Sequence, residues 1–267
     1  MTVLRRLRNY AGLVAVYTRH NLNAQLEYRG GFAAQVVAMF VNNCVWVVFW
    51  ALFFTRFPVL RGWDVHDVIT IWALAASGFG LANAVYGNAL PLANLIAQGQ
   101  LDVWMLYPRA LLPHLLLGRM SATAWGDALF GYAVYVALVR PDLMHLALFV
   151  ALSLSAAALF VGFSVLSGSL GFFLGNSATL TEQWRMAMIT LSTYPATLFS
   201  GTVKLLLYTL VPAAFVTYLP IMALRELSLA DAALAAAGSF AFLLLSAGVF
   251  YQGLRRYESG NLLAMRE

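Results

Sequence analysis

The stretch GGFAAQVVAMFVNNCVWVVFWALFF, residues 30–54, decides the fold class because it contains no charged side chain. A helix needs about 20 mostly apolar residues to cross the hydrocarbon core of a bilayer, so this stretch predicts a transmembrane helix. The composition agrees, since 62% of the 267 residues are hydrophobic and 10% are charged, whereas soluble domains carry about 25% charged residues. We therefore expect lipid to be the solvent of this chain.

More apolar runs follow along the chain, each bounded by charged residues. They predict six transmembrane helices, over residues 30–54, 68–90, 114–139, 143–174, 186–203 and 232–253. A further apolar segment, residues 204–223, contains Pro212 and Pro220, and proline interrupts a continuous helix. This segment predicts either a seventh span or a re-entrant pair of short helices on the outer side of the membrane.

The basic residues predict the orientation, since loops that face the cytoplasm carry an excess of Lys and Arg. Six spans with both termini inside leave eleven basic residues inside and five outside. The outer five are Arg56, Arg61, Arg140, Lys204 and Arg225. A seventh span would expose the arginine-containing C-terminal tail, so the re-entrant segment is favoured. The predicted fold is an all-α polytopic membrane protein with both termini cytoplasmic.

The first 29 residues are predicted to form a separate element. They carry arginines but lack the continuous apolar region and the small-residue cleavage site of a secretory signal. Leu7, Val14 and Tyr17 supply an apolar side, and the arginines are attracted to anionic lipid headgroups. Residues 1–29 thus predict an amphipathic interfacial helix, with a disordered basic tail as the alternative, and residues 30–267 the membrane domain. The glycine pair 30–31 predicts the hinge between them.

A polar island, AQGQLDVWMLYPRALLP at residues 97–113, lies in the cytoplasmic connection 91–113 between the second and third spans. Leu101, Trp104 and Met105 share one face at helical spacing, which is typical of an apolar protein-docking helix. An ordinary interfacial loop, with Trp104 and Tyr107 in the headgroup layer, is the alternative. Spacing alone does not separate the two.

Polar residues inside the predicted spans mark a possible substrate path. Asp127 lies near the middle of the third span, where a charge costs some kcal/mol, so its carboxyl either faces a path or is hydrogen-bonded to a neighbouring helix. Asn42 and Asn83 suit hydrogen bonds between helices or the same path. Trp125 suits a stacking wall for a flat or cationic ligand, or ordinary packing.

Small residues mark the predicted close contacts between helices. In the second span they follow at helical spacing, as Ser77, Gly80, Ala84 and Gly87.

Several classes of function are excluded. The one cysteine, Cys44, allows no internal disulfide, and the scattered histidines predict no metal site. A P-loop needs the lysine of G-x-x-x-x-G-K-[ST], and the only lysine, Lys204, follows a valine. No catalytic residue, no cofactor and no nucleic-acid partner are predicted for this chain.

Three stretches carry a family resemblance: LNAQLEYRGGF (22–32), IAQGQLDVWMLYPRALLP (96–113) and STYPATLFSGTVKLLLYTLVPAAFVTYLP (192–220). With them, nearly the whole chain resembles an ABC type-2 exporter permease. More narrowly, it resembles the six-span branch of paired permeases that includes viologen-exporter-like systems. Gln100 departs from the family pattern, in which an acidic residue is usual.

The resemblance implies a subunit of an ATP-driven exporter in the bacterial cytoplasmic membrane, moving an amphipathic, cationic or lipid-like substrate outward. ATP and Mg²⁺ would bind to a separate ATPase dimer, and a second permease would complete the path. Segment 91–113 would hold the coupling helix, with Trp104, Met105 and Leu106 in apolar depressions of the ATPase and Asp102 and Arg109 in charge pairs. The implied contacts are Tyr28, Arg29, Gln98, Gln100, Leu101, Asp102, Trp104, Met105, Leu106 and Arg109. A secondary carrier, or a scaffold subunit of a membrane enzyme, is the alternative.

Overall fold

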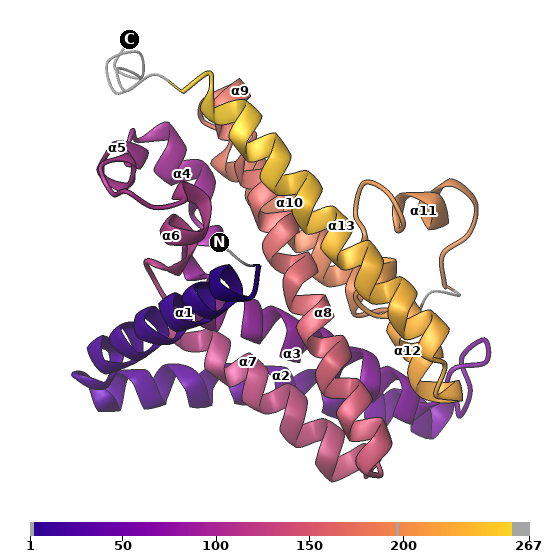
Figure 1. Cartoon of the computed structure of the whole chain (residues 1–267). Helices are drawn as coiled ribbons and strands as arrows, with labels where there is room; N and C mark the ends of the chain where they lie inside the picture. Colours follow the sequence, from indigo (N-terminus) through magenta and orange to yellow (C-terminus); the bar gives the residue numbers. More distant parts are fainter. Residues whose placement is uncertain (1–2, 196–197, 258–267) are drawn as a thin grey trace.

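The computed structural model describes residues 3–195 and 198–257, and these form helices joined by loops, without a β-strand (Figure 1). The helices are α1 (Val3–Leu26), α2 (Arg29–Arg56), α3 (Val65–Val85), α4 (Leu92–Ala97), α5 (Leu101–Met105), α6 (Leu111–Leu117), α7 (Ala122–Val134), α8 (Leu143–Gly168), α9 (Gly171–Leu174), α10 (Ala178–Ser192), α11 (Gly201–Leu206), α12 (Tyr218–Glu226) and α13 (Leu229–Leu254). A π-helical turn, Tyr135–Val139, continues α7.

Among the described residues, five helices are long and apolar enough to cross a membrane. They are Arg29–Arg56, Val65–Val85, Ala122–Val139, Leu143–Leu174 and Leu229–Leu254. An α-helical, polytopic membrane protein is thereby confirmed. The predicted fifth span is not among the five, because α10 begins at Ala178 and ends at Ser192 rather than covering 186–203. Six spans and cytoplasmic termini stay predictions.

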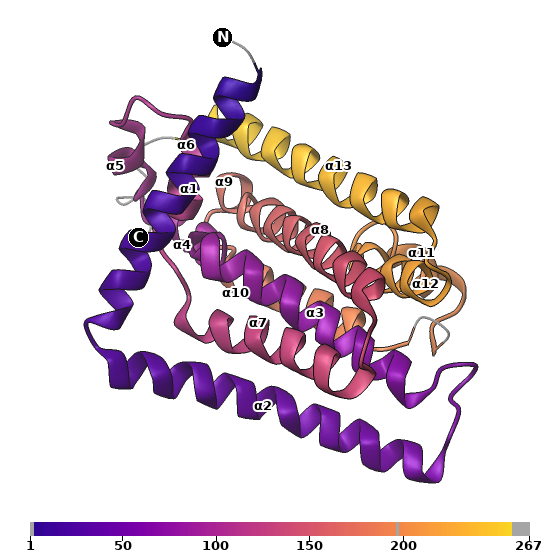
Figure 2. The ribbon, with the colours of Figure 1, turned by 60° about the horizontal axis from the view of Figure 1, so that its bottom comes forward.

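The long helices pack as a row. Figure 2 shows α13, α8, α3, α7 and α2 following one another across the bundle, and each contacts the next. The inner members are well covered, with 72% of the α3 span and 61% of the α8 span buried, whereas only 11% of the α2 span and 22% of the α13 span are buried. The two edges of the row therefore present their apolar surfaces to lipid or to another subunit.

Glycines allow α3 and α7 to approach closely. A Cβ atom on Gly80 of α3 would lie 2.7 Å from the carbonyl oxygen of Ala124, and one on Gly131 of α7 would lie 2.8 Å from the backbone nitrogen of Ser77. Real Cβ contacts are essentially never this short. The prediction of a close helix contact at Gly80 is confirmed, and Gly131 supplies the facing side.

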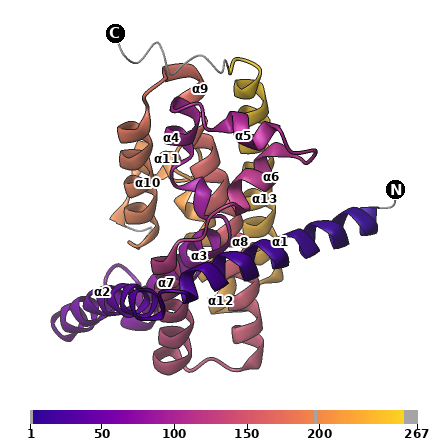
Figure 3. The same ribbon diagram turned by 90° about the vertical axis from the view of Figure 1, so that its left-hand side faces the viewer.

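The predicted third span, 114–139, is interrupted. α6 ends at Leu117 and α7 begins at Ala122, since the intervening backbone bonds to the end of α3 instead of to its own helix. The Gly87 N–H donates to the Arg119 carbonyl at 2.9 Å, and the Ser121 N–H donates to the Asn83 carbonyl at 3.0 Å. α6 thus belongs with α4 and α5, and Figure 3 shows these at one end of the molecule with α9 and the last turn of α13.

The predicted N-terminal helix is present as α1, which runs across the bundle beside α5 and α6 (Figure 2). Its place at the membrane interface stays a prediction. The Asn21 amide donates to the Leu117 carbonyl at 2.9 Å, and the Tyr10 and Tyr86 hydroxyls lie 3.0 Å apart. The break between α1 and α2 falls at residues 27–28, so the glycine pair 30–31 was the wrong position for the hinge. The division at residue 29 into interfacial helix and membrane domain stays a prediction.

The segment 204–223 contains only short helices, α11 and the first part of α12, with a turn after Pro212. A continuous seventh span is therefore not formed there, while re-entry into the membrane stays a prediction.

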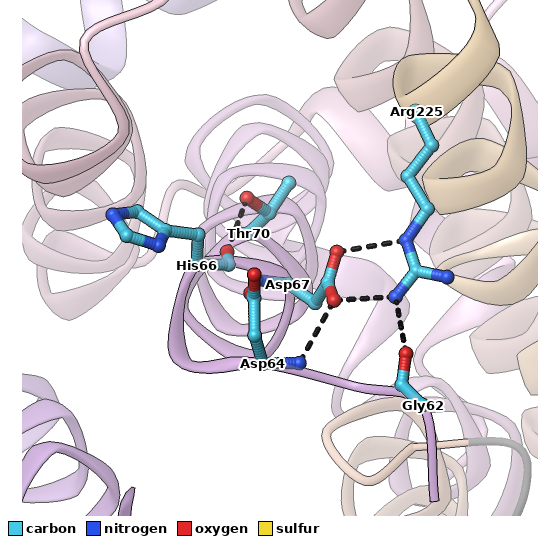
Figure 4. A network of polar contacts seen from close by, with 6 residues as sticks. All are labelled: Gly62, Asp64, His66, Asp67, Thr70 and Arg225. Atoms are coloured by element: carbon cyan, nitrogen blue, oxygen red, sulfur yellow. Dashed lines mark hydrogen bonds and ion pairs between the residues drawn. The ribbon is translucent and has the colours of Figure 1, made fainter. Parts of the chain in front are cut away.

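An ion pair fastens α12 to the start of α3 (Figure 4). It lies at the opposite end of the molecule from α4 and α5 (Figure 1). The Arg225 Nε donates to Asp67 Oδ1 at 2.8 Å, Nη2 donates to Asp67 Oδ2, and Nη2 also donates to the Gly62 carbonyl at 3.3 Å. The guanidinium lies over the Trp63 ring, 4.6 Å from its centroid. Asp67 also closes a capping box with Asp64 at 2.9 and 3.0 Å. The hydrogen bonds to the Asp67 carboxylate raise the pKa of Arg225, so its guanidinium stays charged.

Candidate translocation cavity and inner docking surface

A cavity of about 470 Å³ opens between α2, α3, α7, α8 and α10. Most of its wall is apolar, and we call it the aromatic cavity. Its lining includes Met39, Asn42, Asn43, Trp46, Trp72, Ala75, Ala76, Phe79, Asp127, Phe160, Ile189 and Tyr194. The size falls within the range of pockets that hold small organic ligands, about 300–1,000 Å³.

The sequence allowed the Asp127 carboxyl of α7 either to face a path or to bond to a neighbouring helix. In the structure it borders a cavity and also bonds to α2. It lines the aromatic cavity, and its Oδ1 accepts a hydrogen bond of 2.7 Å from the Asn43 amide of α2. Only 6% of Asp127 is exposed, and a buried carboxyl is costly unless a partner satisfies it. The Asn43 contact therefore holds a polar group at the cavity wall.

A pair of stacked tryptophans forms the flat part of the same wall. The Trp46 and Trp72 ring centroids lie 5.1 Å apart with the ring planes 18° from parallel. Trp46 is 39% exposed, while the Trp72 Nε1 is buried without a hydrogen-bond partner. The stack offers a broad face to an apolar, aromatic or cationic ligand.

Of the other three residues predicted to face a path, one lines the aromatic cavity and two do not. Asn42 lines the aromatic cavity and is exposed. Asn83 does not line it, because its amide donates back to the Phe79 carbonyl of its own helix at 2.9 Å. Trp125 does not line it either, because its Nε1 donates to the Met120 sulfur at 3.0 Å. Asn83 and Trp125 are thus not part of this cavity wall, and a path role for them stays a prediction.

A second cavity, of about 560 Å³, adjoins the first on the side of α1 and α4. Mostly polar groups form its wall, and we call it the polar vestibule. Its polar side chains include Gln25, Gln35, Asn94, Arg119, Ser121, Glu182 and Arg185. Leu90, Ser121 and Arg185 line both cavities, so the two spaces meet along a common edge.

The predicted docking helix is present as α5, but only part of its predicted face points outward. Leu101 is fully buried in its own chain, and Trp104 is half-buried against Gly118, where an added Cβ would lie 2.8 Å from Trp104 Cζ2. Met105 is exposed as expected, whereas Leu101 is not, since helical spacing groups residues on a face without saying which way it points. The outward apolar residues, with their exposed fractions, are Val103 (59%), Met105 (45%), Leu106 (83%) and Tyr107 (52%). We call these four the inner docking surface.

The polar residues predicted to contact the ATPase are mostly accessible. Tyr28, Arg29, Gln98, Gln100 and Arg109 are exposed. Gln98 and Gln100 bond to each other at 2.7 Å. Asp102 points inward instead, because its Oδ1 is buried and it interacts with Tyr257 beyond the end of α13. Burial and the Asp102 carboxylate raise the pKa of Tyr257 to about 12. A charge pair between Asp102 and a partner stays a prediction.

A histidine that the sequence did not single out joins α1 to the docking region. His114 of α6 is 3% exposed, and its Nε2 forms a hydrogen bond with the Tyr17 hydroxyl of α1. The Trp104 and Tyr107 rings lie edge-on to it, each with its centroid 5.0 Å away. Burial, and secondarily Arg109, lowers the pKa of His114, so the ring is neutral at pH 7.

Acidification is expected to loosen α1. Because the pKa of His114 is lowered on folding, the unfolded state binds the proton first, and the stability is lost as the pH falls through the ordinary histidine value of about 6.5. Hydrogen exchange of α1, corrected for intrinsic rates, should therefore accelerate below that pH. His114→Phe should remove this response, whereas His66→Phe, at an exposed site at the other end, should keep it. An equal response in both variants would contradict the assignment to His114.

No group of three or more His, Cys, Asp or Glu side chains that could hold a metal ion occurs in residues 3–195 and 198–257.

Comparison with known proteins gives one match. No curated protein and no solved structure matches the chain. The family described as ABC-2 family transporter protein matches residues 40–260, from α2 to beyond α13. Permeases of this family work in the membrane and generally pair with an ABC ATPase. The chain therefore belongs to the ABC-2 transporter family, as a multi-pass permease subunit of an ABC transporter.

Proposed function

We propose that the chain is the permease of an ATP-driven exporter in the bacterial cytoplasmic membrane, moving an amphipathic, cationic or lipid-like substrate outward. ATP and Mg²⁺ bind to a separate ATPase dimer, since the single lysine of this chain lies outside any P-loop sequence. A second permease, a similar chain or another copy, completes the path. The narrower relation to viologen-exporter-like systems belongs to this proposal.

The joined cavities carry the proposal. The polar vestibule lies beside α1 and α4 at the end of the docking region, and the aromatic cavity continues from it between the long helices. A substrate that enters from the inner side thus meets polar groups first and the Trp46–Trp72 stack next. Such a graded wall suits a molecule with one polar and one apolar part.

The inner docking surface supports an ATPase partner at the same end. Leu106 is 83% exposed directly after the short helix α5, whose other face is fixed by Leu101 and Trp104. An apolar helix face that is held rigidly from behind is suited to a partner's groove. A push on α5 also reaches α1, through the contacts of His114 with Trp104 and Tyr17.

The proposed topology places the end of the molecule with the docking region on the cytoplasmic side and the opposite end on the outer side. Both termini, α1 and α4–α6 lie inside, α10 with its flanking residues completes six spans, and residues 204–223 re-enter from outside. Arg225 then lies on the outer side with Asp67. The backbone freed around Pro212 is tolerable at membrane depth only where protein covers it, and Val211, Ala213 and Ala214 are indeed buried.

The test is ATP-dependent uptake into inside-out vesicles that hold the permease with its co-purifying ATPase. Trp72→Ala removes one half of the ring stack and is expected to lower uptake of a lipophilic cation or a fluorescent lysophospholipid about tenfold, equivalent to 1.4 kcal/mol. Trp125→Ala, the same change away from the cavity, should have little effect at equal abundance. Uptake driven by an ion gradient without ATP would instead establish the secondary carrier, and ATP-dependent uptake that Trp72→Ala leaves intact would place the path elsewhere.

A further inference from the structure

The charges of the polar vestibule do not balance. Glu182 is paired with Arg185 one turn away on α10. Arg119, which is exposed, has no carboxylate within ion-pair distance among residues 3–195 and 198–257. The wall therefore carries one uncompensated positive charge, with the amides of Gln25, Gln35 and Asn94 around it.

The geometry points to a binding site for an anionic headgroup, phosphate or carboxylate, of an amphiphile whose apolar part lies in the aromatic cavity. This inference rests on the proposed function and names its substrate class. A guanidinium binds phosphate and carboxylate oxygens through paired N–H donors, and neutral amides add donors without adding charge. Arg119 is the group that would hold the headgroup.

The edge that the two cavities share indicates how a ligand with a headgroup and an apolar chain lies across them. Leu90, Ser121 and Arg185 face both spaces, so a chain attached to a headgroup in the polar vestibule passes directly into the aromatic cavity. There Trp72, Phe79 and Phe160 supply an apolar wall. Burial of apolar surface stabilises the complex in proportion to the area removed from water.

Asp127 fixes the direction in which such a ligand binds. Its carboxyl lies on the wall of the aromatic cavity, bonded to Asn43. This carboxyl offers no positive charge to a negative headgroup, whereas Arg119 at the other end attracts one. The two residues thus orient an anionic amphiphile with its headgroup in the polar vestibule.

The position of the polar vestibule allows the ligand to enter from the membrane. Gln25 belongs to the last turn of the interfacial helix α1 and Gln35 to the first turns of α2. The vestibule therefore lies where the interfacial helix meets the first span, which is the level of the inner headgroups in the proposed topology. A lipid-like molecule reaches it without leaving the headgroup layer.

The experiment measures binding to the purified full-length permease, without ATPase or ATP, by quenching of tryptophan fluorescence. The probes carry the same brominated chain on three headgroups: lysophosphatidylglycerol (anionic), lysophosphatidylcholine (zwitterionic) and a trimethylammonium surfactant (cationic). The anionic probe is expected to bind about tenfold more tightly than the cationic one, a difference of 1.4 kcal/mol. Arg119→Gln should abolish this preference and Arg119→Lys should retain part of it. Arg56→Gln, the same change at an exposed site at the far end of α2, should leave the preference unchanged.

Three results would overturn the inference. One is equal or tighter binding of the cationic probe by the wild-type permease, which needs no variant to fold; loss of that binding in Asp127→Asn would assign it to the carboxyl. Another is an anionic preference that survives in folded Arg119→Gln. The third is inorganic phosphate displacing the anionic probe as effectively as unbrominated lysophosphatidylglycerol, since the chain would then contribute nothing. The proposed function fails separately, if anionic binding is intact but no ATP-dependent transport accompanies it.

Discussion

Leu106→Asp is expected to abolish co-purification of the ATPase while the permease remains abundant in the membrane. Leu106 is 83% exposed at the centre of the inner docking surface, so the folded permease alone loses no packing. Truncation of an interface anchor commonly costs about 2 kcal/mol or more, roughly thirtyfold in affinity. A carboxylate in the same groove adds its own desolvation cost. The measurement is the amount of ATPase bound per permease.

The matched control is Leu143→Asp, because Leu143 is 82% exposed at the other end of the molecule. It should leave ATPase binding unchanged. Trp104→Ala is expected to behave differently from both, lowering membrane abundance because this ring packs on Gly118 and His114 within its own chain. Undiminished ATPase binding by Leu106→Asp would move the docking site to another part of the inner face, beginning with residues 22–29.

Gly131→Ala is expected to destabilise the fold more than any other single methyl group added to α7. The new Cβ would overlap the Ser77 hydroxyl and the Ala73 carbonyl of α3, and backbone atoms cannot turn away as a side chain can. Overpacking costs typically 1–3 kcal/mol, and stability of a folded domain is only about 5–15 kcal/mol. Thermal unfolding in detergent and the amount of folded permease in the membrane measure the loss.

Gly80→Ala, on the facing helix, should show a loss of similar size, because its Cβ would meet the backbone of Ala124 and Ala128. Gly248→Ala, in α13, has nothing within 4 Å of the new Cβ and should be neutral or slightly stabilising, since alanine favours helix over glycine. If all three variants unfold at the same temperature, the α3–α7 contact is not as close as described.

Apolar length predicted most of the spanning helices, because burial in lipid needs only an uncharged run of sufficient length. It gave the wrong start for α10, which begins at Ala178, before the charged residues Glu182 and Arg185. These charges were read as the boundary of a span, yet they pair on one helix and form part of a cavity wall. It also failed at residues 118–121, where bonds to α3 interrupt a helix that the sequence alone makes continuous.

The sequence predicted those parts of the site where the type of a residue also indicates which way its side chain faces. Asp127 and Asn42, which line the aromatic cavity, were singled out because polar groups are rare in lipid-embedded helices. Trp72 was missed, although Trp72, Ala75, Ala76 and Phe79 repeat at helical spacing along one face of α3. α3 is apolar on every side, so no polar face shows which side borders the cavity. For the same reason the spacing that grouped Leu101 with Trp104 gave no sign that their face turns inward.

The Arg225–Asp67 ion pair has a consequence for how the chain is made. The two residues are 158 positions apart, and a ribosome delivers the N-terminal part first. Until residue 225 has been made, Asp67 lacks the Arg225 guanidinium that holds α12 against the start of α3. The contact between these two helices can therefore form only when nearly the whole permease has been translated.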